Sequence, residues 1–542
     1  MKIFITVLTS IILISSIPVY SQEAVSSLND DLTVNWRESY FSGKPLEIGQ
    51  NVQYLFDDYM VEDRFGLKRV IGPVEKYKNN PLFIDEDKPW ELSSTSWSGA
   101  YLRYVIYDPA EKLYKGWYLM YRYIPGIETG YNYSTLYAES KDGISWKKPE
   151  LDFYVIDGRK TNIVLHKENG TAQIQDITLD TQAKDPQKRY AALVKMIPPG
   201  EKIRCIVLMF SPDGRKWDFA PEPVLFRGAN DGSYSMVRDT ENDRWLLFRR
   251  PPTNALIKPG EGVFHKNPLN PESGGMNIKR RVSVSVSKDL KTWSYPRGLQ
   301  VLDEMDDAEI GSMGNAMDID QARVINYGGV YIGFIHLMDN LTIETPRECH
   351  MMWSRDGFQW QRHPLKLPFI QNGGPGEWDS GGVITLTTMS DDKGTWIYYT
   401  GTNTPQGEKR IPSFTGSGRA FVGKDRWVGQ QASAAGGYLL TRQFILEGNR
   451  LVLNFKSQVN QPPPNWKSLI KAELLQAQDD QVQAVPYPGF TLSDCDGITE
   501  KEGYEYVVTW KGTSDLSTLK GKPVYIRFYL QNTTLYTFRI SD

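Results

Sequence analysis

One heptapeptide pattern, Ser-x-Asp-Gly-x-x-Trp, recurs along this chain and constrains its fold more than any other feature. It stands at residues 140–146, 211–217 and 354–360, and a variant with Leu in place of Gly stands at 287–293. Successive copies begin 71, 76 and 67 residues apart. Asp and Gly are typical of tight turns, and alternating runs such as Arg281–Val286 precede these turns. Four turns at one period predict repeated β units.

A second repeat lies between these turns. Five short segments begin with an aromatic residue and continue as apolar strands: Tyr114–Tyr121, Tyr190–Val194, Trp245–Phe248, Tyr331–Ile335 and Trp396–Tyr399. Repeated four-stranded units of roughly this size are typical of β-propellers. We therefore predict an all-β fold in which a five-bladed β-propeller spans residues 50–430.

The pattern of residue types in the sequence changes after Gly436. Four strand-like segments, separated by turns rich in Pro, Asp and Gly, follow at Arg450–Lys456, Ile470–Ala477, Tyr504–Trp510 and Val524–Leu530. Short strands with such turns are typical of a β-sandwich. We expect residues 431–542 to form a C-terminal β-sandwich that packs on the propeller.

The N-terminus has the pattern of a secretory signal. Met1 and Lys2 precede the apolar run Ile3–Ile17, and small residues lead into a polar segment. We predict a signal peptide over 1–21 and a lead segment over 22–49, with a buried N-terminal helix as the alternative. No later stretch reaches about 18 apolar residues. The expected protein is therefore exported, periplasmic or secreted, without a membrane anchor.

Composition excludes several classes of function. The chain has 542 residues, with 62 Lys+Arg against 65 Asp+Glu and a net charge of -3, which argues against nucleic-acid binding by bulk electrostatics. The three cysteines, Cys205, Cys349 and Cys495, have no CxxC spacing and predict neither a disulfide framework nor a zinc site. No nucleotide or metal motif is found. We expect no cofactor, and a structural Ca²⁺ held by loop carboxylates is the alternative.

The predicted architecture resembles known carbohydrate-active enzymes. A propeller followed by a β-sandwich resembles glycoside hydrolase family 32, and the propeller is similar to that of family 43. The chain is closer still to a group of secreted bacterial family-32-like proteins. The matching segments cover nearly the whole mature chain: residues 55–61 (Leu-Phe-Asp-Asp-Tyr-Met-Val), 80–82, 89–91, 378–381 (Trp-Asp-Ser-Gly) and 515–523. The resemblance implies an enzyme that acts on carbohydrate.

Only one of the family's three catalytic motifs is present. Family 32 uses an Asp in Asn-Asp-Pro, an Asp in Arg-Asp-Pro and a Glu in Glu-Cys, and this chain contains only Glu348-Cys349. Because glycoside hydrolysis needs two carboxylates about 5–10 Å apart, the acidic candidates are Glu348, Glu377 and Asp379. Asp57 and Asp58 stand behind them. Roles in turns and at strand starts are the alternative for all five.

Cationic residues follow the aromatic-led strands at a fixed offset. Five residues after each leading aromatic stand Leu119, Lys195, Arg250, His336 and Gly401, with Arg122 and Arg249 nearby. If this offset faces the propeller axis, these residues form a positive funnel suited to a uronate or sulphated sugar. Ordinary solvent-exposed strand ends are the alternative.

A positive funnel favours elimination over hydrolysis. Cations that neutralise a uronate carboxylate make the C5 proton more acidic, so that a base can remove it while the C4 substituent leaves. We predict His336 as the base, with His350 as second choice. Arg122, Lys195, Arg249 and Arg250 would bind an anionic, ulvan-like oligosaccharide at its non-reducing end. The alternatives are a glycoside hydrolase using Glu348 with Glu377 or Asp379, and a non-catalytic glycan-binding propeller in which His336 is a core residue.

Overall fold

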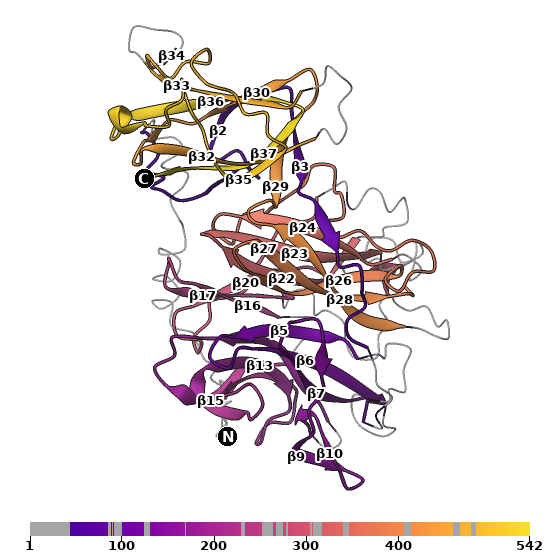
Figure 1. Ribbon diagram of the computed structural model, residues 1–542. Helices are drawn as coiled ribbons and strands as arrows, with labels where there is room; N and C mark the ends of the chain where they lie inside the picture. The colour runs from indigo at the N-terminus through magenta and orange to yellow at the C-terminus, as the bar shows by residue number, and fades with distance from the viewer. Residues whose placement is uncertain are drawn as a thin grey trace, which may run out of the picture.

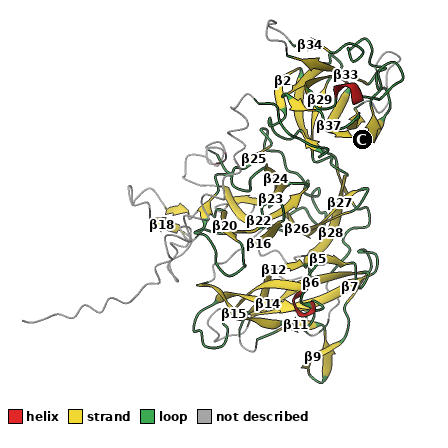
Figure 2. Ribbon diagram, turned by 90° about the vertical axis from the view of Figure 1, so that its left-hand side faces the viewer, coloured by secondary structure: helices red, strands yellow, loops and turns green. Residues whose placement is uncertain are grey.

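The structure is a computed structural model of the whole chain. It describes residues 44–84, 88, 90–91, 100–123, 131–167, 170–228, 234–251, 264–266, 275–277, 280–303, 306, 317–339, 346–405, 414–458, 467–477 and 484–542, a few of them by their backbone alone. The expected signal peptide therefore lies outside the described residues, as does most of the lead segment. Strands dominate the chain (Figure 2), and two β domains stand one above the other (Figure 1).

Five antiparallel sheets form the propeller, as predicted. From the innermost strand outward, blade 1 contains β5 (Leu102–Asp108), β6 (Leu113–Tyr123), β7 (Tyr131–Ser140) and β11 (Ile163–Leu165), with β8 (Trp146–Lys147) also paired to β7. Blade 2 contains β12 (Ala172–Leu179), β13 (Tyr190–Met196), β14 (Cys205–Ser211) and β15 (Asp218–Arg227). Blade 3 contains β16 (Ser235–Asp239), β17 (Arg244–Arg249), β20 (Ser283–Ser287) and β21 (Arg297–Gly298).

The last two blades complete the ring. Blade 4 contains β22 (Met317–Tyr327), β23 (Val330–Asp339), β24 (Glu348–Ser354) and β25 (Gln361–Arg362), and blade 5 contains β26 (Gly382–Ser390), β27 (Gly394–Thr402), β28 (Thr415–Gly423) and β4 (Val74–Lys76). Each innermost strand contacts the innermost strands of the blades on either side, and β26 contacts β5. The ring is therefore closed, and each aromatic-led segment is the second strand of its blade.

The ring closes with a strand from before the first blade. Strand β4 pairs with β28 through Lys76 and Ala420, so blade 5 combines segments far apart in the sequence. After β28 the chain enters the sandwich instead of turning back into a fourth strand. This explains why five aromatic-led strands accompany only four Ser-x-Asp-Gly turns.

These turns also join neighbouring blades. In the turn of blade 1, Ser140 Oγ accepts the Gly143 amide at 2.9 Å, and Asp142 accepts the next two amides. In blades 1 and 2 the Gly carbonyl of the turn also accepts a hydrogen bond from the preceding blade. Trp117 donates to Gly214 at 2.8 Å, and Tyr398 donates to Gly143 at 2.9 Å. The repeat therefore forms a turn and, in these two blades, a hydrogen-bonded link to the preceding blade.

The sandwich contains two sheets built from both ends of the described chain. One sheet has the order β3 (Leu67–Ile71), β29 (Val428–Ala432), β37 (Thr533–Ser541), β32 (Arg450–Ser457) and β35 (Glu502–Val507), with β1 (Gln53–Tyr54) beside β37. The other has the order β2 (Val61–Phe65), β30 (Gly437–Thr441), β36 (Pro523–Gln531), β33 (Leu469–Gln476) and β34 (Val485–Pro486), with β31 (Phe444–Ile445) beside β36.

This pairing differs from the boundaries expected at residues 50 and 431. Strands β1, β2 and β3 belong to the sandwich, and Leu46 and Ile48 are buried in its core. The partners of β2 and β3 lie more than 350 residues away along the chain, at Gly437–Thr441 and Val428–Ala432. Local sequence patterns carry no information about pairing at that separation.

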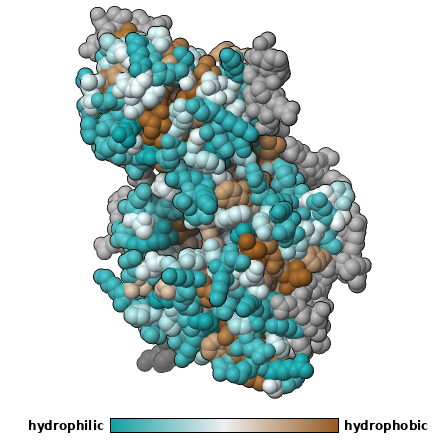
Figure 3. Space-filling view, viewed as in Figure 1, coloured by the Kyte–Doolittle hydropathy of each residue, from teal (hydrophilic) through white to brown (hydrophobic). Residues whose placement is uncertain are grey.

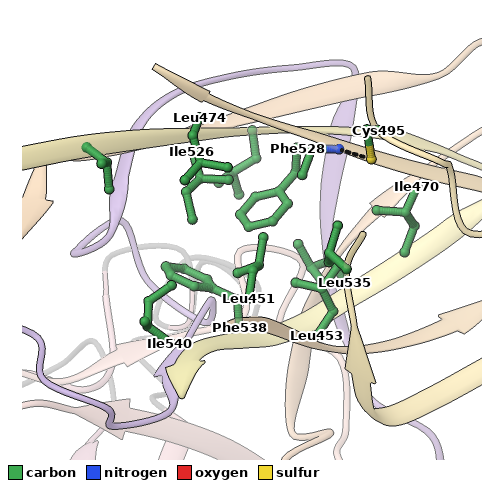
Figure 4. Packing of buried hydrophobic residues seen from close by; sticks show 14 of the residues in the cluster. Leu451, Leu453, Ile470, Leu474, Cys495, Ile526, Phe528, Leu535, Phe538 and Ile540 are labelled. Carbon is green, nitrogen blue, oxygen red and sulfur yellow. Dashed lines mark hydrogen bonds between the residues drawn. The ribbon is translucent and has the colours of Figure 1, made fainter. Parts of the chain in front are cut away.

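The sandwich core is aliphatic and aromatic. Leu451, Leu453 and Phe538 face Ile526 and Phe528 across the two sheets (Figure 4). The sulfur of Cys495 accepts the Ala472 amide at 3.4 Å, and all three cysteines are buried and free. In the space-filling view, hydrophilic residues cover most of the visible described surface, with apolar residues in scattered patches (Figure 3).

The remaining elements are small. They are the hairpin of β9 (Leu151–Ile156) and β10 (Arg159–Thr161), the pair β18 (Phe264–Lys266) and β19 (Gly275–Asn277), and the 3-10 turns η1 (Pro186–Lys188) and η3 (Ser517–Leu519). Among the helices of the described chain, none has the length and apolar character of a membrane span.

Candidate active site

Polar side chains interrupt the innermost strands near the start of three blades. The pairing register shifts at Arg103 of β5, at Gln175 of β12 and at Asp320 of β22, so each of these residues sits in a β-bulge. Bulges are common beside active sites because they re-aim a side chain out of the regular ladder. All three side chains are largely buried. The polar end of the ring is therefore the end where the innermost strands begin.

The side chain of one arginine occupies the centre of the ring beneath this end. The guanidinium of Arg323, from β22, donates to Asp176 at 2.9 Å, to the Tyr234 carbonyl at 2.8 Å and to the Leu386 carbonyl at 2.9 Å. It also lies 5.1 Å from the ring centre of Tyr104. These contacts reach blades 2, 3, 5 and 1 from blade 4. One guanidinium group thus connects all five blades at the centre of the ring.

Two aspartates on β22 lie above this plug and share one arginine. Asp318 accepts the Arg280 amide at 2.7 Å. Nη1 of Arg280 lies 3.6 Å from one Asp318 oxygen and 4.0 Å from one Asp320 oxygen. That shared nitrogen keeps the two oxygens less than about 8 Å apart, inside the separation used by glycosidase carboxylate pairs.

Asp320 lies among three guanidinium groups. Besides Arg280, it contacts Arg250 at 3.5 Å and Arg347 at 3.5 Å. Cations this close favour the ionised carboxylate. These separations are longer than those of tight bidentate pairs.

Asp318 has the opposite environment. Burial raises its pKa to about 6, because the protein interior disfavours the charged form. Its Oδ2 atom is buried and has no hydrogen-bond partner among the described residues. A protonated carboxyl group beside a carboxylate that lies among cations is an arrangement typical of an acid and base pair. Asp318 is suited to hold a proton, and Asp320 to accept one.

A small cavity adjoins the pair. It has a volume of about 10 Å³ and is lined by Arg249, Arg250, Arg281 and Asp320, among others. That volume is close to the minimum for one water molecule. Residues 252–263, 267–274 and 307–316, which connect strands at this end, lie outside the described residues.

His336 lies in a different setting from the one expected of a base. The side chain is fully buried in β23, and its Nε2 accepts the Thr385 amide of blade 5 at 2.8 Å. Burial lowers its pKa to about 3. A neutral, enclosed imidazole that satisfies a backbone amide corresponds to the core alternative, and this geometry does not favour the predicted base.

Glu348 is at the correct end of blade 4 but outside the aspartate pair. Its side chain is about half exposed, and it lies 2.8 Å from Nε2 of His350. The adjacent Cys349 is buried, and its sulfur lies 3.1 Å from the Thr385 hydroxyl. The Glu-Cys dipeptide is therefore placed on a blade strand, with its carboxylate turned to His350.

Glu377 and Asp379 lie together beside blade 5. Asp379 is buried, accepts Lys76 at 2.6 Å and accepts the Tyr399 hydroxyl at 3.1 Å. Glu377 is exposed and lines a groove of about 1020 Å³ between β3 and residues 363–373. No contact among the described residues joins either side chain to Asp318 or Asp320. Asp379 is thus a neutralised structural carboxylate.

The predicted cations separate into different surroundings. Arg250 joins Asp320, whereas Arg249 stacks on Phe226 with its guanidinium 4.2 Å from the ring centre. Lys195 is buried in β13. Arg122 is in β6, and its side chain lies outside the described residues. Arg122, Lys195 and Arg249 stand on second strands, and Arg250 directly follows one, so the backbone of all four lies one strand away from the axis.

Asp57 links the sandwich to blade 4, whereas Asp58 makes its ion pairs within the sandwich. Arg355 of blade 4 donates to Asp57 at 2.6 and 2.8 Å, and Asp58 accepts Arg64 and Arg69. These contacts agree with the turn alternative for both residues. Among the described residues, no group of three or more His, Cys, Asp or Glu side chains is arranged to hold a metal ion.

The residues missed in the sequence lie on the innermost strand β22 or just before the third strands of blades 3 and 4. Asp318, Asp320, Arg280 and Arg347 stand in no recognised motif. One signal was present, since Met317–Asp320 alternates apolar and acidic residues where the first strand of blade 4 begins. Asp318 and Asp320 would therefore share one face of a strand.

No protein-family model and no curated protein matches this chain. Among solved structures, it is similar to an N-acetylgalactosamine deacetylase from F. plautii in complex with blood group B trisaccharide, at 14% identity over 67% of this chain and 97% of that one, with a TM-score of 0.36. It is also similar to a fructofuranosidase from Schwanniomyces occidentalis complexed with fructosylnystose, at 11% identity, 86% and 98% coverage and a TM-score of 0.39. No residue role is carried over from either.

Proposed function

We propose that this chain is a carbohydrate-active enzyme that cleaves a glycosidic bond of an anionic oligosaccharide at the polar end of the propeller. The observation that carries the proposal is the Asp318–Asp320 pair. Both carboxyl groups lie within 4.0 Å of one Arg280 nitrogen, and one of them has a raised pKa. This combination supplies an acid and a base on the same strand.

Hydrolysis follows directly from these two environments. Asp318 donates its proton to the glycosidic oxygen as the bond to the anomeric carbon breaks. Asp320 takes a proton from a water molecule whose oxygen bonds to the anomeric carbon. One water is consumed, and both protons are accounted for. The cavity beside Asp320 has room for a single water molecule.

The arginines favour an anionic substrate. Arg250, Arg280 and Arg347 carry three positive charges against Asp320 and a partly protonated Asp318. In a protein of net charge -3, this local excess attracts a carboxylate or sulphate group. Guanidinium groups bind both anions with paired N–H donors.

The same arginines suit elimination from a uronate, which is the second candidate. In that reaction the arginines neutralise the sugar carboxylate, and a base removes the C5 proton while the bond from C4 to its oxygen breaks and that oxygen takes the proton held by Asp318. Asp320 would take the role first assigned to His336. The product carries a C4=C5 double bond, whereas hydrolysis leaves a saturated product.

The test is to incubate the purified protein with uronate-containing oligosaccharides, ulvan-like fragments included, and to follow far-ultraviolet absorbance together with product mass. Cleavage with gain of one water and no new absorbance would support hydrolysis. New absorbance with chain cleavage, or with loss of one water, would indicate a lyase or a dehydratase. Saturable binding with no product would indicate a glycan-binding propeller.

Variants connect the activity to the site. Asp318→Asn and Asp320→Asn should each reduce turnover by at least about 100-fold, the contribution of a positioned acid or base. The matched control is Asp152→Asn, because Asp152 is exposed in the β9 hairpin. Full turnover in both site variants would overturn the assignment.

Export is a separate part of the proposal. Residues 1–21 have the pattern of a cleaved secretory signal, which suits an enzyme that meets large polysaccharides outside the cytoplasm. Sequencing the N-terminus of the protein recovered from culture medium or periplasm tests this point. An intact Met1 there would contradict cleavage.

A further inference from the structure

Two consecutive arginines of blade 3 face different neighbours. Arg250 contacts Asp320 of blade 4 at 3.5 Å. Arg249, the last residue of β17, stacks on Phe226 in β15 of blade 2. Successive side chains in a strand point to opposite faces of the sheet. The guanidinium of Arg249 therefore belongs to the seam between blades 2 and 3.

Arg249 is a packed cation without a counter-ion among the described residues. Its Nε atom is buried and has no hydrogen-bond partner in the part of the chain that the structure describes. Burial lowers the pKa of the guanidinium, and the one opposing influence comes from Tyr234. By contrast, Arg244 on the same strand pairs with Asp239 at 2.7 Å. Desolvating a cation without a counter-ion costs free energy, so an unmatched guanidinium in a seam marks a place for an anion.

A row of side chains leads from the axis to Arg249. Gln173 pairs with Lys195, Lys195 pairs with Ile206, and Ile206 pairs with Phe226 across the four strands of blade 2. Directly opposite residues share one face of a sheet. Ile206 and Phe226 pack against blade 3 in a common hydrophobic cluster. Gln173 and Lys195 therefore face the same seam, nearer the axis than Phe226.

The inner part of this row is polar and buried. Lys195 is 5% exposed and Gln173 is 3% exposed. Oε1 of Gln173 is buried and lacks a hydrogen-bond partner within the described part of the chain. Natural proteins leave few buried polar atoms unsatisfied. An amide oxygen in this position is suited to accept a hydrogen bond from a hydroxyl group.

We propose that the seam between blades 2 and 3 is a second anion-binding site, in which Arg249 and Lys195 hold a carboxylate or sulphate and Gln173 accepts a hydroxyl of the same sugar. The identification of the ligand as a sugar rests on the proposed function. Because Arg250 serves the aspartate pair on the other face of blade 3, the substrate carries anionic groups on two different sugar units. The site thus selects polyanionic chains over chains with a single charge.

The direct test is calorimetric titration with sodium glucuronate, sodium sulfate and glucose at constant ionic strength. The wild-type protein should bind glucuronate, and Arg249→Met should weaken the binding assigned to the seam by about tenfold or more, as expected for a charge-assisted pair. Glucose should not bind measurably. Sulfate bound as tightly as glucuronate would overturn the role of Gln173. Unchanged glucuronate binding in Arg249→Met would overturn the site.

Arg238 provides the matched control. It stacks on Trp245 in the same blade, 5.4 Å from the ring centre, but it is paired with Asp243. Arg238→Met should leave glucuronate binding unchanged. Arg249→Met should also unfold at a temperature no lower than that of the wild type, because it removes an unmatched cation. A markedly lower melting temperature would mean that Arg249 is a structural residue.

Kinetics separate this inference from the proposed function. With an oligosaccharide that carries two anionic groups, Arg249→Met should raise KM about tenfold and leave kcat within a few-fold of the wild type. With a singly charged substrate, KM should not change. A wild-type protein that forms no product from any oligosaccharide would contradict the proposed function. The glucuronate titration would still test the seam site independently.

Discussion

Nη2 of Arg323 donates to Asp176 over 2.9 Å, and the two residues come from the innermost strands of blades 4 and 2, which are not neighbours in the ring. Asp176 is 2% exposed. Arg323→Met should therefore destabilise the protein by about 3–5 kcal/mol, because it leaves a buried carboxylate unpaired. Urea unfolding measures this loss.

The double variant Arg323→Met with Asp176→Asn checks the cause. It should recover part of the lost stability, since the second change removes the stranded charge. A single Arg323→Met variant within about 1 kcal/mol of the wild type would show that the axial ion pair is dispensable.

The pKa of Asp318 predicts a pH dependence of activity. A general acid must be protonated, and burial raises the pKa of Asp318 to about 6. The value of kcat/KM should therefore fall above about pH 6, by tenfold per pH unit at the limit. A pH profile of initial rates measures this fall. A profile that stays flat to pH 8 would exclude Asp318 as the acid.

The same group affects stability. The folded pKa exceeds the unfolded value of about 3.9, so the folded state binds more protons between about pH 4 and pH 6. The contribution of protonated Asp318 to the free energy of unfolding is fully present below about pH 4. It is lost as pH rises from about 4 to about 6, by up to about 3 kcal/mol. The difference in unfolding free energy between Asp318→Asn and wild type should grow by this amount from pH 4 to pH 7, which denaturant titrations at each pH would show.

His336 should behave as a structural residue. Its folded pKa of about 3 lies below the unfolded value of about 6.5, so its protonation favours unfolding and stability is lost as pH falls from 6.5 toward 3. His336→Gln keeps an acceptor for the Thr385 amide. Turnover in this variant should stay within a few-fold of wild type, measured at neutral pH. A loss above about 100-fold would restore His336 as the base.

The turn glycines should differ in their tolerance of a methyl group. A Cβ on Gly214 would lie 2.6 Å from the Trp117 ring, whereas one on Gly200 would meet nothing within 4 Å; both have positive φ, 73° and 86°. Gly200→Ala should cost about 1–2 kcal/mol from backbone strain alone. Gly214→Ala should cost about 1–3 kcal/mol more, because the buried ring must shift. Thermal unfolding compares the two. Equal losses would mean that the contact with Trp117 is unimportant.

Much of the propeller is visible in the sequence because its periodic parts are local. The Ser-x-Asp-Gly turns close on their own amides, and each aromatic-led strand packs beside a neighbouring turn, as Trp117 does on Gly214. Such contacts leave a repeated pattern of residue types. The strands before β5 leave none, since their partners are hundreds of residues away.

The candidate site was harder to predict for a physical reason. The conspicuous cations, Lys195 and Arg249 among them, stand on second strands, which face the seams between blades. The axis is reached from the innermost strands, where a bulge at Asp320 decides which side chain points inward. Bulges depend on packing around the ring, so no sequence motif predicts them.

The closure of both domains has a consequence for synthesis. Strand β1 pairs with β37, and β4 pairs with β28, so neither domain has its full set of strands until these late segments have been synthesised. At roughly 5–20 residues per second, the separation between β1 and β37 corresponds to about half a minute to a minute and a half. During that time the early strands have unpaired edges. The propeller therefore has all its strands once β28 is made, whereas the sandwich has its full set only when β37 is made.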